Sequence, residues 1–217
     1  MNKKYYVVLK GKKTGVFNSW NECKKNVLGF SGAIYKSFGD LELANEYFKN
    51  GFFANKEVKF SKITNSLVEE DVQAFLQKGY TISFVDGSYD QKIKRFGYGT
   101  LIFNSSQKIE LFKSFNSPEF LESRNVSGEI FGVIATLNWC INHKIKKIKI
   151  YYDYEGIERW FDNSWEAKTK IAKYYVSQLG NIKSKFDSIL FYKIVAHSNI
   201  TYNDIADKLA KKSLRYK

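Results

Sequence analysis

The feature that most constrains the fold of this 217-residue chain is residues 81–89, TISFVDGSY, in which apolar and polar residues alternate. Alternation with period two, together with many β-branched and aromatic residues, predicts a β-strand. The glycine directly after Asp86 predicts that the strand breaks there, which places Asp86 at its carboxyl end. Because open α/β sheets bind their ligands at the carboxyl ends of strands, Asp86 is a candidate functional residue.

The patterns that follow residue 90 predict the rest of this domain. Strands are expected at 96–103, 108–115, 147–153 and 188–196, and helices at about 130–141 (with Ser127 as cap), 155–161, 165–179 and 201–214. Three strands with short connections, followed by strands that alternate with helices, are typical of an α/β domain. The predicted architecture is a mixed five-stranded sheet flanked by helices.

Three further acids occupy positions comparable to that of Asp86. Asp153 ends the fourth strand, Glu129 opens the helix before it, and Asp207 lies in the first half of the last helix. If the first and fourth strands are neighbours, Asp86 and Asp153 lie side by side. Close carboxylates repel one another unless cations neutralise them, and oxygen ligands of this kind select Mg²⁺ or Mn²⁺. Two such ions can activate a water and stabilise a leaving 3′ oxygen in phosphodiester hydrolysis.

Each acid also has an explanation without catalysis. The helix dipole favours Glu129 in a first turn, and Asp153 could cap the helix that follows it. Asp207 could pair with a neighbouring lysine such as Lys211, and Asp86 before glycine could belong to a turn. Each of these explanations is stronger than catalysis for a single residue, but the joint arrangement of four acids favours a metal site.

The first 50 residues predict a small unit with strands at 5–10, 16–17 and 33–38, a helix capped by Ser19 and a second helix at 41–48. Its lysines outnumber its acids, and aromatic residues such as Trp20 and Tyr35 lie among them. This composition fits a surface that contacts phosphates and stacks on bases or sugars. Core packing explains the aromatic residues of so small a unit equally well.

The bulk composition points to a polyanionic partner. The chain has a net charge of +13 and a pI near 9.5, which makes nucleic acid the first candidate. Two distant cysteines and two histidines cannot form a structural zinc site by themselves. Neither a signal peptide nor a membrane span is predicted, and we expect a reduced, cytoplasmic monomer without an obligate protein partner.

The amino-terminal motifs resemble the hybrid-binding domain of type 1 ribonucleases H. The matching stretches are YVV at 6–8, GKKTGVF at 11–17, SWNEC at 19–23 and GFSGAIYKSF at 29–38. The resemblance implies a small three-stranded α/β domain that binds RNA/DNA hybrids. It further implies that Trp20 and the Tyr35–Lys36 pair contact the DNA strand. Many family members have a second lysine at the position of Ser37.

Four motifs of the second half resemble the catalytic domain of the same family. They are FVDGS at 84–88, RNVSGE at 124–129, IYYDYEGIERW at 150–160 and AHSNITYNDIADKLA at 196–210. The resemblance implies metal-dependent cleavage of the RNA strand of an RNA/DNA hybrid, which leaves 3′-hydroxyl and 5′-phosphate ends. The implied metal ligands are Asp86, Glu129, Asp153 and Asp207.

The resemblance also assigns two residues near these acids. His197 would assist water activation or product release, and Asn125 would contact a substrate 2′-hydroxyl or base edge, which distinguishes RNA from DNA. Some family members have a long basic loop where residues 162–168 are short and only mildly basic. We expect Trp165 in this loop to pack in the core.

These interpretations give a three-part chain: residues 1–50 bind the hybrid, 51–79 form a linker and 80–217 form the catalytic domain. The linker contains a helix at about 66–78 that starts in a capping box at Ser66. If this helix docks onto the second domain, the tether shortens to about residues 51–65. Tethering of the two modules would favour repeated cuts on long hybrids. Two alternatives remain open, a catalytically silent hybrid-binding protein and a DNA nuclease or recombinase of the same fold.

Overall fold

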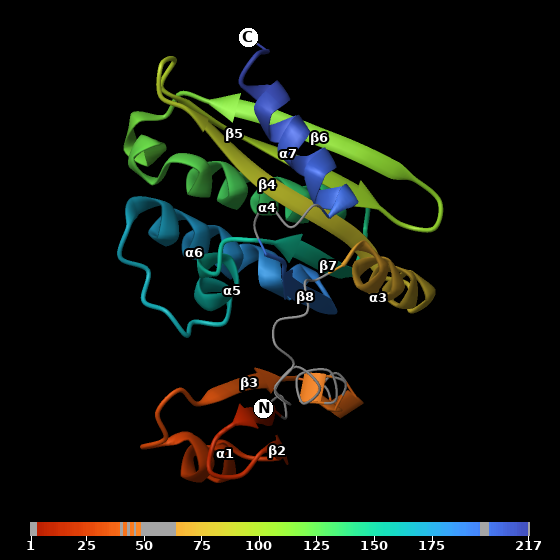
Figure 1. Cartoon of the computed structure of the whole chain (residues 1–217), viewed down its shortest axis with the longest axis vertical. Coiled ribbons are helices and arrows are strands. Elements are labelled where there is room, and N and C mark those ends of the chain that lie inside the picture. Colours follow the sequence, from red (N-terminus) through yellow and green to blue (C-terminus); the bar gives the residue numbers. More distant parts are fainter. Residues whose placement is uncertain are drawn as a thin grey trace. The chain divides into compact units, whose positions relative to one another are not determined.

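The computed structural model of the chain describes residues 4–39, 41–42, 44–45, 47–48, 64–195 and 200–216 (Figure 1). The chain divides into two compact units, Met1–Ser61 and Lys62–Lys217. None of the helices in the described residues is long and apolar enough to cross a membrane.

The first unit contains a three-stranded antiparallel sheet in the order β2-β1-β3. Its elements are β1 (Tyr5–Lys10), β2 (Gly15–Phe17), α1 (Trp20–Val27) and β3 (Ile34–Phe38). Ser19 caps α1 as predicted, because its side chain accepts from Glu22 N while the Glu22 carboxylate accepts from Ser19 N. The described positions between 41 and 48 are helical.

Both faces of this small sheet are covered. Under α1, Val8 packs with Cys23 and Val27, and on the other face Val7 and Leu9 pack with Ala44. Strand alternation produces this division, since successive side chains of β1 point to opposite faces.

The second unit contains a five-stranded sheet in the order β6-β5-β4-β7-β8. Its strands are β4 (Thr81–Asp90), β5 (Arg95–Phe103), β6 (Lys108–Phe115), β7 (Lys147–Tyr152) and β8 (Ser188–Lys193). Neighbouring strands pair antiparallel from β4 to β6 and parallel from β4 through β7 to β8. The predicted mixed five-stranded sheet is therefore confirmed.

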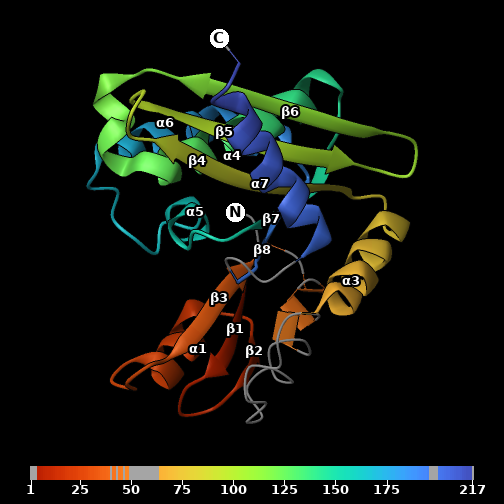
Figure 2. The ribbon, with the colours of Figure 1, turned by 45° about the horizontal axis from the view of Figure 1, so that its top comes forward.

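Helices cover both faces of this sheet (Figures 1 and 2). One face carries α4 (Arg124–Asn142), α5 (Gly156–Phe161) and α6 (Lys170–Ile182), which share a core with side chains such as Val85 and Ile150. The other face carries α3 (Asn65–Gln77) and α7 (Thr201–Ser213), which pack on Phe84 and Tyr151. Two short 3₁₀ helices, Pro118–Ser123 and Lys183–Lys185, complete the unit.

Three local predictions were wrong. The strand that carries Asp86 continues through Gly87 to Asp90. Helix α4 begins at Arg124, so Ser127 lies inside it and donates instead to the Phe120 carbonyl at 2.6 Å. Helix α3 is capped by the Thr64 hydroxyl, which accepts from Leu67 N, and Ser66 lies within the first turn.

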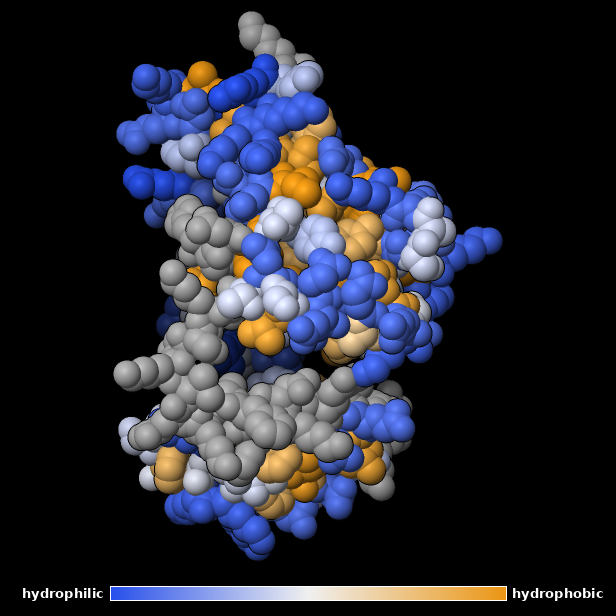
Figure 3. All heavy atoms as spheres, turned by 45° about the vertical axis from the view of Figure 1, so that its right-hand side comes forward, coloured by the Kyte–Doolittle hydropathy of each residue, from blue (hydrophilic) through white to orange (hydrophobic). Residues whose placement is uncertain are grey.

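The surface of the protein is rich in hydrophilic residues, as expected for a chain in which 26% of the residues are charged. In the view of Figure 3, hydrophilic residues cover most of the visible surface, and smaller hydrophobic areas lie between them. Such scattered apolar areas are normal for a folded domain.

Candidate active site

Asp86 and Asp153 lie where the central parallel strands separate. The pairing of β4 with β7 ends at Phe84 and Tyr151, and β4 then continues past the end of β7. Asp86 is two residues beyond the last β4 partner, and Asp153 directly follows β7. Both aspartates therefore lie at the carboxyl edge of this parallel pair, where ligands of α/β sheets bind.

Glycine at position 87 allows helix α4 to contact the strand backbone beside Asp86. A Cβ atom on Gly87 would lie 2.1 Å from the Asn125 carbonyl oxygen and 2.4 Å from Glu129 N, closer than any side chain permits. The glycine is thus required for close packing of the helix rather than for a turn. It brings Glu129, in the second turn of α4, next to the strand that carries Asp86.

A second glycine brings helix α7 to the same place. Gly99 of β5 is the cross-strand partner of Asp86, and a Cβ atom there would lie 2.1 Å from the Ala206 carbonyl oxygen. Asp207 directly follows Ala206, so α7 approaches the sheet at the Asp86–Gly99 pair. The Asp207 carboxylate accepts a hydrogen bond from Lys211 Nζ at 2.7 Å. This is the lysine pairing that would explain Asp207 without a catalytic role.

Glu129 is the most deeply buried of the four acids, with 2% of its surface exposed. Its Oε1 atom accepts from the backbone N–H groups of Asp153 and Tyr154 at 3.0 and 3.4 Å. These bonds connect α4 to the end of β7 and hold the carboxylate beside Asp153.

Burial and the charges of neighbouring acids raise the pKa values of Asp86 and Glu129. Burial, followed by the charges of Asp153 and Asp207, raises the pKa of Asp86 from 3.8 to about 7. Burial and the charges of Asp153 and Asp86 likewise raise the pKa of Glu129 well above its ordinary value. Raised carboxyl pKa values with these causes are typical of functional sites.

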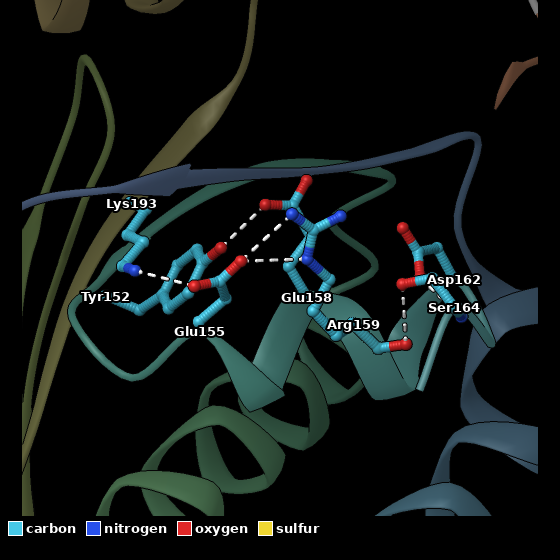
Figure 4. Close-up of polar contacts among 7 residues, drawn as sticks. All are labelled: Tyr152, Glu155, Glu158, Arg159, Asp162, Ser164 and Lys193. Carbon is cyan, nitrogen blue, oxygen red and sulfur yellow. Dashed lines mark hydrogen bonds and ion pairs between the residues drawn. The ribbon is translucent and has the colours of Figure 1, made fainter. Parts of the chain in front are cut away.

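Two other acids of this region, Glu155 and Glu158, accept hydrogen bonds from nearby side chains. Figure 4 shows that Glu155 accepts from Arg159 Nε at 3.0 Å and from Lys193 Nζ at 3.1 Å, while Glu158 accepts from the Tyr152 hydroxyl at 2.6 Å. Lys193 and Arg159 lower the pKa of Glu155. Glu155 is therefore a structural acid that joins α5 to β8, in contrast to the mutually repelling Asp86 and Glu129.

The four acids fit a divalent cation by their chemistry and charge. Carboxylate oxygens are the ligands that Mg²⁺ and Mn²⁺ prefer, and a cation would relieve the repulsion that raises the pKa of Asp86. Among the described residues, no group of three or more His, Cys, Asp or Glu side chains is already arranged to hold a metal ion. Glu129 Oε1 and Asp207 Oδ2 accept hydrogen bonds, but each carboxylate has a second oxygen that can coordinate an ion.

The remaining predicted residues of this site differ in position. Asn125 lies exposed in the first turn of α4, whose backbone contacts Gly87, and so is close to the acids. His197 lies outside the described residues. The core position expected for Trp165 was wrong, because 45% of its surface is exposed in the loop before α6.

The first unit presents an exposed aromatic cluster. The ring centroid of Trp20 lies 5.7 Å from that of Tyr35 and 5.7 Å from that of Tyr6, and Trp20 and Tyr35 are 41% and 44% exposed. Lys36 extends instead toward the Phe38 and Tyr47 rings, whose cluster lies on the other face of the sheet. The sequence interpretation missed Tyr6, which only the pairing of β1 with β3 brings near Tyr35.

Comparison with known proteins identifies the class to which this arrangement belongs. Residues 78–215 match the RNase H family model, and residues 4–48 match the model of the ribonuclease H1 N-terminal domain. Since the first match covers more than half of the chain, the chain belongs to the RNase H family. The resemblance to type 1 ribonuclease H is confirmed by this order of domains.

Curated relatives resemble a short part of the chain. A ribonuclease H of Saccharomyces cerevisiae is 51% identical over 43 residues, which are 20% of this chain and 12% of the yeast protein. A ribonuclease H of Crithidia fasciculata is 45% identical over 47 residues, 22% of this chain and 10% of that protein. The chain thus matches about a tenth of the length of these relatives.

Solved structures show the same fold over most of the second unit. RNase H1 of Halobacterium salinarum NRC-1 has a TM-score of 0.52 at 16% identity, covering 63% of this chain and 98% of that protein. An N-terminal RNase H domain from Mycobacterium tuberculosis has a TM-score of 0.53 at 18% identity, covering 63% and 94%.

Proposed function

We propose that this protein is an endoribonuclease that cleaves the RNA strand of RNA/DNA hybrids and leaves 3′-hydroxyl and 5′-phosphate ends. The observation that carries the proposal is the convergence of four carboxylates from β4, α4, the end of β7 and α7. The charges of Asp153 and Asp207 contribute to the raised pKa of Asp86, and the Glu129 carboxylate accepts a hydrogen bond from the backbone N–H of Asp153. Membership in the RNase H family supports the reaction class.

Asp86, Glu129, Asp153 and Asp207 would hold two divalent cations, Mg²⁺ or alternatively Mn²⁺. When bound, such ions supply activation of the attacking water and stabilisation of the leaving 3′ oxygen. The chain itself contributes the fixed carboxylates and an environment that excludes much of the solvent around Glu129. Asn125, which is exposed in the first turn of α4, would form a hydrogen bond with a ribose 2′-hydroxyl. The role of His197 in water activation or product release stays a prediction, as does a cytoplasmic location.

The first unit would bind the hybrid through its aromatic cluster, in which the exposed Trp20 and Tyr35 would stack on the DNA strand while the half-buried Tyr6 packs against Trp20. Lys36 lies on β3, an edge strand of the sheet, and would contact a phosphate at this edge. The match to the ribonuclease H1 N-terminal domain supports this assignment.

Cleavage assays with three substrates test the proposal. With Mg²⁺ and a labelled RNA/DNA hybrid, double-stranded RNA or double-stranded DNA, we expect the protein to cut only the RNA of the hybrid. Binding of the hybrid without cleavage would indicate a silent hybrid-binding protein, and cleavage of DNA would indicate a DNA nuclease of this fold.

A variant tests the assignment of the acids. Asp153→Asn should abolish cleavage and leave hybrid binding largely intact, whereas Asp162→Asn, which alters an acid in the loop after α5, should cut at the wild-type rate. Equal activity in Asp153→Asn would reject the role given to the four acids.

A further inference from the structure

Helix α3 lies outside the part of the chain that matches the RNase H family model, yet it belongs to the second compact unit. The helix ends at Gln77, and the family match begins at residue 78. The compact unit begins at Lys62, before the helix. Val68, Val72 and Phe75 of α3 are buried in the core beneath α7. The helix that the sequence placed in the linker is therefore packed against the sheet.

The first contact of α3 is with the start of α7. Asn65 Oδ1 accepts a hydrogen bond from Thr201 N at 2.8 Å and another from Thr201 Oγ1 at 3.2 Å. The N-cap residue of α7 is Ile200, whose aliphatic side chain cannot accept a hydrogen bond. The first N–H groups of a helix need such an acceptor, and Asn is among the residues that supply it best. Asn65 thus acts as an N-cap that is delivered from another helix.

A second contact, one helical turn further along α3, reinforces the first. Glu69 Oε2 accepts from the Tyr202 hydroxyl at 2.7 Å. Asn65 and Glu69 lie four residues apart and therefore on one face of the helix, so that they hold two successive residues of α7.

The third contact is with β7. The Asp71 carboxylate pairs with Lys149 and accepts from the Tyr151 hydroxyl, and both partners lie on β7. Lys149 is 5% exposed, and its Nζ lies 3.6 Å from the ring centroid of Phe75 of α3. This partly buried charge pair fixes the position of α3 on the strand that precedes Asp153.

The two elements held by α3 carry two of the four acids, since α7 carries Asp207 and β7 leads into Asp153. We propose that α3 is a positioning element of the active site, and that Asn65 and Glu69 are positioning residues that set the start of α7 and thereby the place of Asp207. This inference rests on the proposed function for its effect on catalysis. Its effect on α7 is independent of the reaction.

The test compares Asn65→Ala with Asn65→Asp, which retains the acceptor oxygen and places a negative charge at the start of α7, where the helix dipole favours it. Ser66→Ala is the matched control, because its hydroxyl bonds to Glu70 within α3 itself. Hydrogen exchange of the α7 amides is measured in the metal-free protein without substrate. Urea unfolding reports global stability, and kcat and KM are measured on an RNA/DNA hybrid.

Loss of a cap of ordinary strength should accelerate exchange of the first-turn amides of α7 about fivefold to tenfold in Asn65→Ala. We expect kcat to fall at least about twofold with KM unchanged, since a cap sets geometry rather than substrate affinity. Asn65→Asp should restore both quantities, and Ser66→Ala should change neither. Tyr202→Phe should raise exchange in the same turn.

Three outcomes would overturn the inference: unchanged exchange of α7 in Asn65→Ala, a uniform rise of exchange over the whole unit in proportion to lost global stability, or a change of KM with kcat unaltered. Failure of the wild-type protein to cut hybrids would overturn the proposed function. The exchange data would still decide whether α3 holds α7.

Discussion

Replacing Asp86 with asparagine should stabilise the metal-free protein. The folded state raises the pKa of Asp86 from 3.8 to about 7, through burial and through repulsion by Asp153 and Asp207. The folded state therefore binds this proton more tightly than the unfolded state. Its contribution to stability is fully present below the unfolded pKa and is lost as the pH rises from about 4 to about 7.

The magnitude follows from the same shift. A displacement of about three pKa units corresponds to about 4 kcal/mol at most between the two protonation states. Asparagine keeps an acceptor for the Gly87 N–H, which Asp86 Oδ1 binds at 2.7 Å, and removes the charge. We expect Asp86→Asn to unfold with a free energy about 2–4 kcal/mol higher than wild type at pH 8. The difference should shrink toward zero near pH 4.

Urea unfolding in the presence of a chelator, at a series of pH values, measures this difference. Asp204→Asn is the control, because it makes the same charge change at an exposed position in the first turn of α7. It should lower stability by a few tenths of a kcal/mol, since an acid near a helix N-terminus is favourable. A metal-free Asp86→Asn protein that is no more stable than wild type at pH 8 would refute the reasoning that burial and the neighbouring charges raise the pKa of Asp86.

Three further predictions test other parts of the structure. Asp71→Ala should lower the free energy of unfolding by about 2–4 kcal/mol in urea, because it removes the carboxylate that Lys149 and the Tyr151 hydroxyl share. Asp71→Asn, which keeps an acceptor, should cost less, and equal costs would contradict the pairing. Gly87→Ala should cost about 3 kcal/mol or more and reduce cleavage, because its methyl group meets the α4 backbone. Gly180→Ala, with open space around the added methyl, should instead gain about 0.5–1 kcal/mol, and similar effects of the two changes would rule out the close approach. Trp20→Ala should weaken hybrid binding roughly tenfold, most visibly at high salt, where stacking outlasts phosphate contacts. If Trp20→Ala binds the hybrid as tightly as wild type across a salt series, Trp20 has a structural role and does not contact the hybrid.

The sequence was sufficient to predict the succession of strands and helices along the chain and the fold class, because period-two and helical patterns record which face of each element is buried. It was less informative about where elements begin and end. Gly87 after Asp86 resembled a break, whereas the structure uses the glycine to admit α4 within a continuous strand. That reason involves a residue 42 positions away in the chain, Glu129, and so leaves no local pattern in the sequence.

The same distinction separates the site residues that could be predicted from those that could not. Four acids at comparable positions on predicted elements already suggested convergence, and the family motifs added their roles. Tyr6 and Asn65 had no such pattern. Tyr6 joins the aromatic cluster through the register of β1 with β3, and Asn65 meets α7 through the packing of α3, so that both depend on tertiary geometry alone.

The two glycines next to Asp86 in the sheet explain how the chain can assemble a strongly repulsive site at all. Asp86 is followed by Gly87, which admits α4, and is paired with Gly99, which admits α7. Backbone contacts at these two glycines bring the helices close to the sheet. Packing of the rest of the unit, including α3 on β7 and α7, can therefore offset the electrostatic cost of the clustered acids. Gly87 sets the distance of α4 from the sheet, and Gly99 sets the distance of α7. Helix α3 acts on the same geometry, because it bonds to both α7 and β7.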